Sequence, residues 1–142
     1  MTHAAAIEAV RAIYQDLAQR PIERNCTLRT ECCQFRLTGQ TPFLTKGEAI
    51  TAAHAMKASG RKKLANPPDG ACPLLDRNTG RCQIYQDRPF GCRTHFCGPA
   101  GGPYARKDVV DLIHRLEDLD RALSGQGAMS LPTAIGQALR EL

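Results

Sequence analysis

The stretch GACPLLDRNTGRCQIYQDRPFGCRTHFC, residues 70–97, carries four of the chain's seven cysteines. Cys72, Cys82 and Cys92 follow one another at ten-residue intervals, and Cys97 comes five residues later. Between them lie turn-forming residues and arginines, without the periodic apolar pattern of a helix. A segment so poor in large apolar residues buries too little surface to offset the loss of its conformational entropy. We therefore predict that thiolates converging on a metal hold this stretch together.

The cysteine content indicates metal or redox chemistry in a reducing compartment. The chain has 142 residues and no tryptophan. Near its start, Glu8 and Arg11 interrupt the apolar run that a signal peptide needs, and no apolar run approaches the length of a membrane span. We expect one cytoplasmic domain, residues 1–142, with a metal-binding core at about residues 22–100 between N- and C-terminal helices. In the cytoplasm, an odd number of cysteines favours metal binding over a disulfide framework.

The net charge of +5 suggests a polyanionic partner, but part of this charge belongs to the cysteine region. Four thiolates around a 2+ centre add a charge of about −2, which lowers the total to about +3. Six arginines near the cysteines can neutralise that negative charge. They are Arg24, Arg29, Arg77, Arg81, Arg88 and Arg93. Nucleic-acid binding is therefore the weaker interpretation of the basic composition.

Two helices are predicted in the first half of the chain. In residues 3–20, apolar side chains recur at three- and four-residue steps, and Pro21 ends the pattern. Thr45 and Glu48 have the spacing of a capping box, in which each side chain accepts a hydrogen bond from the backbone of the other. This capping box predicts a second helix over residues 46–59.

A third helix is predicted over residues 103–124. Its strongest feature is one apolar face, which gives the best helical pattern in the chain and consists of Val109, Leu112, Ile113, Leu116, Leu119 and Leu123. Pro103 is suited to the first helical position and Gly125 to the position after the end. Asp111 and Arg115, four residues apart, are expected to pair on the opposite face.

The remaining segments are predicted to be short. Residues 34–37 fit a short strand, and residues 74–85 fit a β-hairpin with its turn at residues 76–80. From about residues 130–133 onward the sequence fits either a last helix or a mobile tail. The sequence therefore predicts a mainly α fold with a short β-hairpin. It is a small single domain organised around a cysteine-rich metal site in irregular loops.

The spacing of the cysteines leaves the identity of the metal open. Seven thiols exceed the need of one tetrahedral zinc site, and all-thiolate sites suit both zinc and an iron–sulfur cluster. The chain has neither the paired C-x2-C knuckles of zinc modules nor the tight cysteine run of ferredoxins. Widely spaced cysteines favour a site assembled from several loops. The best set of four is Cys72, Cys82 and Cys92 with either Cys32 or Cys33.

Four segments of the chain form a recognisable combination. They are CTLRTECC at residues 26–33, ACPLL at 71–75, RCQIY at 81–85 and RPFGCR at 88–93. Together they resemble the YkgJ-type cysteine-cluster family, a zinc- or iron-chelating family with an N-terminal CxxCxxCC motif. The resemblance covers about residues 26–97. It implies a metal or iron–sulfur site built from Cys26, Cys32, Cys33, Cys72, Cys82 and Cys92.

The chain departs from the family motif at Arg29, where CxxCxxCC has its second cysteine. An arginine supplies no thiolate, so we expect Cys97 to provide the missing metal ligand. His95 is the competing candidate, because histidine is a common ligand and this one lies between two cysteines.

Arg88 and Arg93 have two interpretations. Each guanidinium can donate hydrogen bonds to thiolate sulfur, and so support the cofactor without ligating it. Alternatively, either arginine forms a surface salt bridge, for example with Asp87. The sequence does not separate the two interpretations.

Three classes of function fit these features. The leading one is a metal-binding protein whose iron–sulfur cluster or zinc stabilises the fold and serves redox chemistry or metal handling. The second is a metal-dependent enzyme that uses the cluster at a substrate site. Its nearest acid–base candidates are Asp69, Asp76, Asp87 and His95, and since none lies in a recognised catalytic motif, the sequence favours a non-enzymatic role. The third is a zinc-stabilised module that binds nucleic acid or a protein through residues 61–63 and neighbouring arginines.

Overall fold

The mainly helical prediction is confirmed by a computed structural model, which describes residues 1–22, 41–65, 67, 70–76, 78–79, 81–94 and 103–142. Its elements in chain order are α1 (His3–Ala18), β1 (Phe43–Leu44), α3 (Lys46–Ala58), the 3-10 helix η2 (Tyr85–Asp87), α4 (Phe90–Thr94), the 3-10 helix η4 (Arg106–Asp108), α5 (Val110–Ala122), β2 (Met129–Ser130) and α6 (Leu131–Glu141). The predicted strand at residues 34–37 lies outside the described residues. The single-domain assignment stays a prediction.

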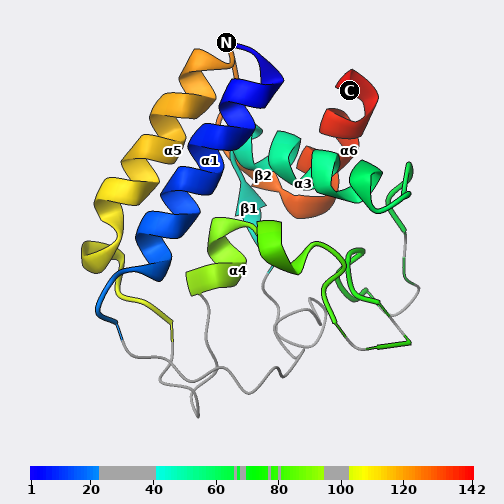
Figure 1. Cartoon of the computed structure of the whole chain (residues 1–142), viewed down its shortest axis with the longest axis horizontal. Coiled ribbons are helices and arrows are strands. Elements are labelled where there is room, and N and C mark those ends of the chain that lie inside the picture. Colours follow the sequence, from blue (N-terminus) through cyan, green and yellow to red (C-terminus); the bar gives the residue numbers. More distant parts are fainter. Residues whose placement is uncertain (23–40, 66, 68–69, 77, 80, 95–102) are drawn as a thin grey trace.

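Helix α3 contacts α1, α5 and α6, so it connects the main helices (Figure 1). One apolar cluster joins α3 and α6 to residues 71–75 and Ile84. A second cluster joins α1 and α5 to Phe90. Gly47, at the start of α3, permits a close approach between helices, because a Cβ at this position would lie only 2.8 Å from Leu119 Cδ2.

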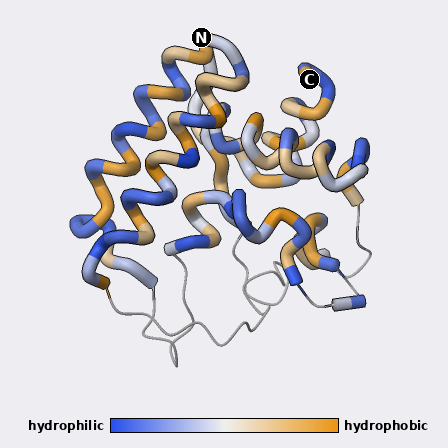
Figure 2. Tube along the Cα trace, viewed as in Figure 1, coloured by the Kyte–Doolittle hydropathy of each residue, from blue (hydrophilic) through white to orange (hydrophobic). Residues whose placement is uncertain are grey.

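Helix α1 forms where the apolar periodicity predicts it. Thr2 is its N-cap, and the Thr2 hydroxyl accepts a hydrogen bond from the Ala5 N–H at 3.1 Å. Its buried side chains recur at helical spacing: Ala6, Ile7, Val10, Ile13, Tyr14 and Leu17. Figure 2 shows hydrophobic residues alternating with hydrophilic ones along both α1 and α5. These two helices therefore bury one face and expose the other.

Helix α3 confirms the predicted helix over residues 46–59, and its capping box is present. The Thr45 backbone N–H and hydroxyl both donate to Glu48 Oε2, each at 3.1 Å. Gly60 follows the helix with a φ of +87°, a backbone conformation that glycine adopts without steric cost.

Helix α5 is shorter than predicted. It begins at Val110, and the expectation that Pro103 opens it was wrong. The Tyr104 N–H donates to the Thr94 carbonyl at 2.9 Å, and η4 fills the interval before the helix. The backbone after Pro103 is therefore tied to the end of α4 before it turns into α5.

Two charged residues of α5, Asp111 and Arg115, pair with Arg20 just after α1 and with Asp16 of α1, whereas Arg121 pairs with Asp118 within α5. The predicted pair between Asp111 and Arg115 is replaced by an Arg115–Asp16 bond of 2.5 Å and by two bonds from Arg20 to Asp111, of 2.5 and 3.1 Å. The Arg20 hydrogen bonds lower the pKa of Asp111. These ion pairs link the exposed edges of the two helices.

The predicted hairpin over residues 74–85 contains one antiparallel bridge, between Leu75 and Cys82. The Asp76 N–H donates to the Arg81 carbonyl at 2.8 Å, which closes the turn. The chain then enters η2, so the second arm of the hairpin is shorter than predicted.

The two strands that form a ladder lie far apart in the sequence. In β1 and β2, Phe43 faces Ser130 and Leu44 faces Met129 in antiparallel register. Helix α6 begins at Leu131, directly after β2. This start agrees with the last helix, one of the two alternatives that the sequence predicted from about residues 130–133 onward. None of the helices in the described ranges is long and apolar enough to cross a membrane.

Two buried carboxylates hold the start of α3. Asp120 is 4% exposed; its Oδ1 accepts the Lys46 N–H at 2.7 Å and its Oδ2 accepts the Gly127 N–H at 3.0 Å. A Cβ on Gly125 would lie 2.5 Å from Asp120 Cγ. The absence of a side chain at residue 125 therefore leaves Asp120 room to bind both donors.

Glu48 is the second of these carboxylates and is 2% exposed. Besides the two donors of Thr45, it accepts the Phe90 N–H at 2.7 Å and the Tyr14 hydroxyl at 3.1 Å, both through Oε1. Burial raises the pKa of Glu48, and the hydrogen bonds from Phe90, Thr45 and Tyr14 oppose this effect. One carboxylate thus joins α1, α3 and the first residue of α4.

We expect Glu48→Gln to lower the free energy of unfolding by roughly 1–3 kcal/mol. Whichever way the glutamine amide is turned, its NH2 group would face the backbone N–H of Phe90 or of Thr45 and leave that N–H without an acceptor. Urea denaturation measures the change. Glu117→Gln makes the same chemical change at an exposed position of α5 and should alter stability by less than about 0.5 kcal/mol. Equal effects of the two substitutions would contradict the role given to Glu48.

Gly125→Ala is expected to destabilise the protein by roughly 1–3 kcal/mol, since the methyl group would displace the Asp120 carboxylate from its two donors. In Gly136→Ala, the added Cβ in α6 would lie 3.8 Å from its nearest neighbour, Arg140 Nη1. This control should stabilise the protein by about 0.5–1 kcal/mol through helix propensity. Thermal denaturation of both variants checks the opposite signs, and stabilisation by Gly125→Ala would show that the close contact has no consequence.

Candidate metal centre

Three of the seven predicted cysteine ligands lie in the described part of the chain. Cys72 is a buried thiol, and Cys82 and Cys92 are partly exposed thiols. Outside the described residues lie Cys26, Arg29, Cys32, Cys33, His95 and Cys97. Within the residues that the structure describes, no group of three or more His, Cys, Asp or Glu side chains could hold a metal ion. The ligand set therefore stays a prediction.

Cys72 and Cys82 belong to one folded segment beside α3. Cys72 is 4% exposed and lies in the apolar cluster of α3 and α6, and Cys82 packs against the same cluster. Leu75 connects them, because its N–H donates to the Cys72 carbonyl at 3.0 Å and it forms the antiparallel bridge with Cys82. The turn predicted from the sequence thus brings two cysteines that are ten residues apart into one compact segment.

Cys92 lies on the short helix α4, which the sequence did not predict. The Cys92 and Arg93 N–H groups both donate to the Pro89 carbonyl, at 3.0 and 3.1 Å, and form its first turn. The first N–H groups of a helix have no acceptor within the helix, and at the start of α4 the Phe90 N–H donates to Glu48 instead. Glu48 therefore fixes the helix that carries Cys92.

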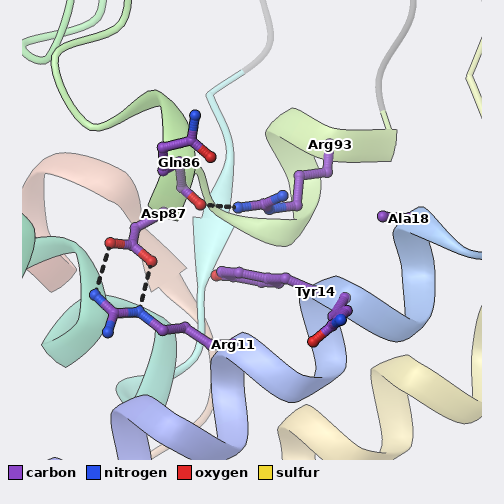
Figure 3. A pocket seen from close by; sticks show the side chains of 7 residues that line it. Arg11, Tyr14, Ala18, Gln86, Asp87 and Arg93 are labelled. Carbon is purple, nitrogen blue, oxygen red and sulfur yellow. Dashed lines mark hydrogen bonds and ion pairs between the residues drawn. The ribbon is translucent and has the colours of Figure 1, made fainter.

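Arg93 points from α4 toward α1 (Figure 3). Its guanidinium lies over the Tyr14 ring, 4.1 Å from the centroid, and donates to the carbonyls of Arg88 at 2.6 Å and Gln86 at 2.7 Å. Burial lowers the pKa of Arg93, while the negative charge of a Cys92 thiolate raises it. Arg93 directly follows Cys92 on α4, and a hydrogen bond from Arg93 to sulfur stays a prediction.

The proposed salt bridge from Arg88 or Arg93 to Asp87 is wrong. Asp87 instead binds Arg11 of α1 in a two-pronged ion pair, with Nε to Oδ1 at 2.9 Å and Nη2 to Oδ2 at 3.0 Å (Figure 3). Arg88 stacks on Tyr85, 3.9 Å from the ring centroid, and donates to the Tyr85 carbonyl at 3.0 Å. No local sequence pattern indicates the contact between Arg11 and Asp87, because the two residues are 76 positions apart.

The described residues that flank the remaining cysteines lie close to α4. A Cβ on Gly91 would lie 3.5 Å from Pro42 Cβ, and the Tyr104 N–H bonds to the Thr94 carbonyl. Ile22 packs against the apolar cluster of α1 and α5, as Tyr104 does. Figure 1 shows α4 on the same side of the molecule as the end of α1. The described residues on either side of the segments that contain the other cysteines therefore lie near the helix that carries Cys92.

The chain matches the model of a known family. A model described as "CxxCxxCC: Putative zinc- or iron-chelating domain" matches residues 24–110, which is more than half of the chain and includes all seven cysteines. No curated protein and no solved structure matches the chain. The resemblance found in the cysteine motifs is thereby confirmed, and the chain belongs to the CxxCxxCC family of zinc- or iron-chelating domains.

Proposed function

We propose that the chain binds zinc or an iron–sulfur cluster through cysteine thiolates, and that the bound centre stabilises the fold and serves redox chemistry or metal handling. The observation that carries this proposal is the family match over residues 24–110. The ligands are drawn from the seven cysteines in that range: Cys26, Cys32, Cys33, Cys72, Cys82, Cys92 and Cys97.

The described donors fit such a centre chemically. Cys72, Cys82 and Cys92 are thiols, and thiolates are the preferred ligands of zinc and of iron–sulfur clusters. Arg93 lies beside Cys92 and can offset the negative charge that several thiolates would bring together. When bound, the centre supplies a cross-link between distant segments and, as a cluster, a site for electron transfer.

Covalent geometry allows further cysteines to reach the neighbourhood of α4. Cys97 follows Thr94 by three residues, so their Cα atoms can be separated by no more than about 11 Å. Cys26 follows Ile22 by four residues, which limits that separation to about 14 Å. These limits support a centre near Cys92 that draws ligands from segments on both sides of it.

In protein purified without exposure to oxygen, we expect metal analysis to find zinc or iron. Cys72→Ser, Cys82→Ser and Cys92→Ser should each lose most of the bound metal, because a hydroxyl is a poor substitute for a thiolate. Thr79→Ser is the control, since it keeps a hydroxyl in the same segment and removes no thiol.

Full metal content in Cys82→Ser and Cys92→Ser would contradict the proposal. Full metal content in Cys97→Ser would show that Cys97 does not replace the cysteine missing at Arg29. Iron accompanied by visible absorption would identify a cluster, whereas a colourless protein with bound zinc would remove electron transfer from the proposal.

Removal of the metal by a chelator under reducing conditions is expected to lower the melting temperature and to expose residues 70–94 to proteases. The reason is that the described part of this segment joins the apolar clusters through only a few large side chains, Leu74, Leu75, Ile84 and Phe90, which hold it less firmly once the cross-link is lost. Limited proteolysis with mass spectrometry locates the cuts, and cleavage within α5 serves as the internal reference. An unchanged pattern after verified metal removal would contradict a stabilising role.

A further inference from the structure

A pocket of about 350 Å³ lies between α1 and the segment that contains η2 and α4 (Figure 3). Its volume is within the range of small-molecule sites. Tyr14 and Ala18 of α1 contribute an aromatic ring and a small side chain, and Arg11, Asp87 and Arg93 contribute charges. None of these residues is a proposed metal ligand, although Arg93 follows Cys92 directly in the sequence.

Arg93 is a partly buried cation, and its hydrogen-bond acceptors among the described residues are backbone carbonyls, which carry no full charge. Its two hydrogen bonds go to backbone carbonyls, which occupy two of the five N–H groups of a guanidinium. Among the residues that the structure describes, no carboxylate forms an ion pair with Arg93. The guanidinium therefore keeps donors and charge for an anion.

The other charged residues of the pocket largely satisfy each other. Asp87 is only 12% exposed and accepts both of its hydrogen bonds from Arg11. With one carboxylate against two guanidinium groups, the lining carries an excess of one positive charge. Tyr14 does not compete for an anion, because its hydroxyl donates to Glu48 and only its ring faces Arg93.

We propose that this pocket binds a small molecule through a carboxylate or phosphate group, with Arg93 as the anchoring cation. Stacking on Tyr14 and the two carbonyl bonds restrict the guanidinium to one orientation, so little conformational freedom is lost when it binds an anion. Gln15 of α1 adds an exposed amide at the edge of the pocket, which can donate to the same anion or to a second polar group of the ligand.

The test uses the full chain as purified and three probes: inorganic phosphate, succinate and neutral succinamide. We expect phosphate or succinate to bind with a dissociation constant of roughly millimolar or below, detected by chemical-shift changes at Tyr14, Gln15 and Arg93. Comparison of the two anions shows which group the pocket prefers. Absence of binding by both anions, or equal binding of succinamide, would overturn the proposal.

Variants locate the site. Arg93→Gln should weaken anion binding about tenfold or more, whereas Asp87→Asn should strengthen it severalfold, because it removes the negative charge and releases Arg11. Ala18→Phe should block the pocket, and Ala12→Phe, at an exposed position of α1 outside it, should leave binding unchanged. Arg93 also donates hydrogen bonds to backbone carbonyls, so the Arg93→Gln protein could unfold. In that case the comparison of Ala18→Phe with Ala12→Phe decides the outcome. Equal anion binding by these two variants would overturn the proposal.

Discussion

The arrangement of the cysteine-bearing region depends on the buried carboxylate of Glu48. A carboxylate withdrawn from water is stable in a protein only when its oxygens are hydrogen-bonded, and Glu48 accepts four such bonds. The donor on α4 is the Phe90 N–H, and α4, with five residues, is too short to be stable by itself. The position of Cys92 is therefore set by a residue of α3 that is more than 40 positions away in the sequence.

Helix α4 connects the proposed metal centre to the proposed anion pocket. Cys92 and Arg93 are consecutive, and the guanidinium of Arg93 extends toward α1 and lies over the Tyr14 ring. Tyr14 lies beneath Arg93 and donates to Glu48, so the two features share one support. A change in the position of α4 would affect both.

The sequence predicted the parts of the fold that are determined by local patterns. Apolar periodicity and the capping box located α1 and α3 within one or two residues, because burial of one face and the satisfaction of helix ends are local requirements. The start of α5 was placed too early, since the bond from Tyr104 to Thr94 is a tertiary contact. Helix α4 was missed because five residues contain no repeating pattern. Likewise, the capping box identified Glu48 but not its bonds to Phe90 and Tyr14.

For the candidate site, the four cysteine-containing motifs were sufficient to identify the family, which the match over residues 24–110 confirms. Spacing does not specify which thiolates converge on one metal, because that depends on how separate segments pack. The support that Arg93 gives to the cofactor stays a prediction, and its contacts with Tyr14 and two carbonyls come from segments that sequence patterns do not relate.

The central claim is that sulfur atoms from separate segments bind one metal centre. X-ray absorption spectroscopy at the metal edge, on protein purified without oxygen, tests this claim most directly. The account predicts a first shell dominated by sulfur at about 2.3 Å. A first shell of nitrogen and oxygen alone at about 2.0–2.2 Å, or protein that contains no metal, would contradict it.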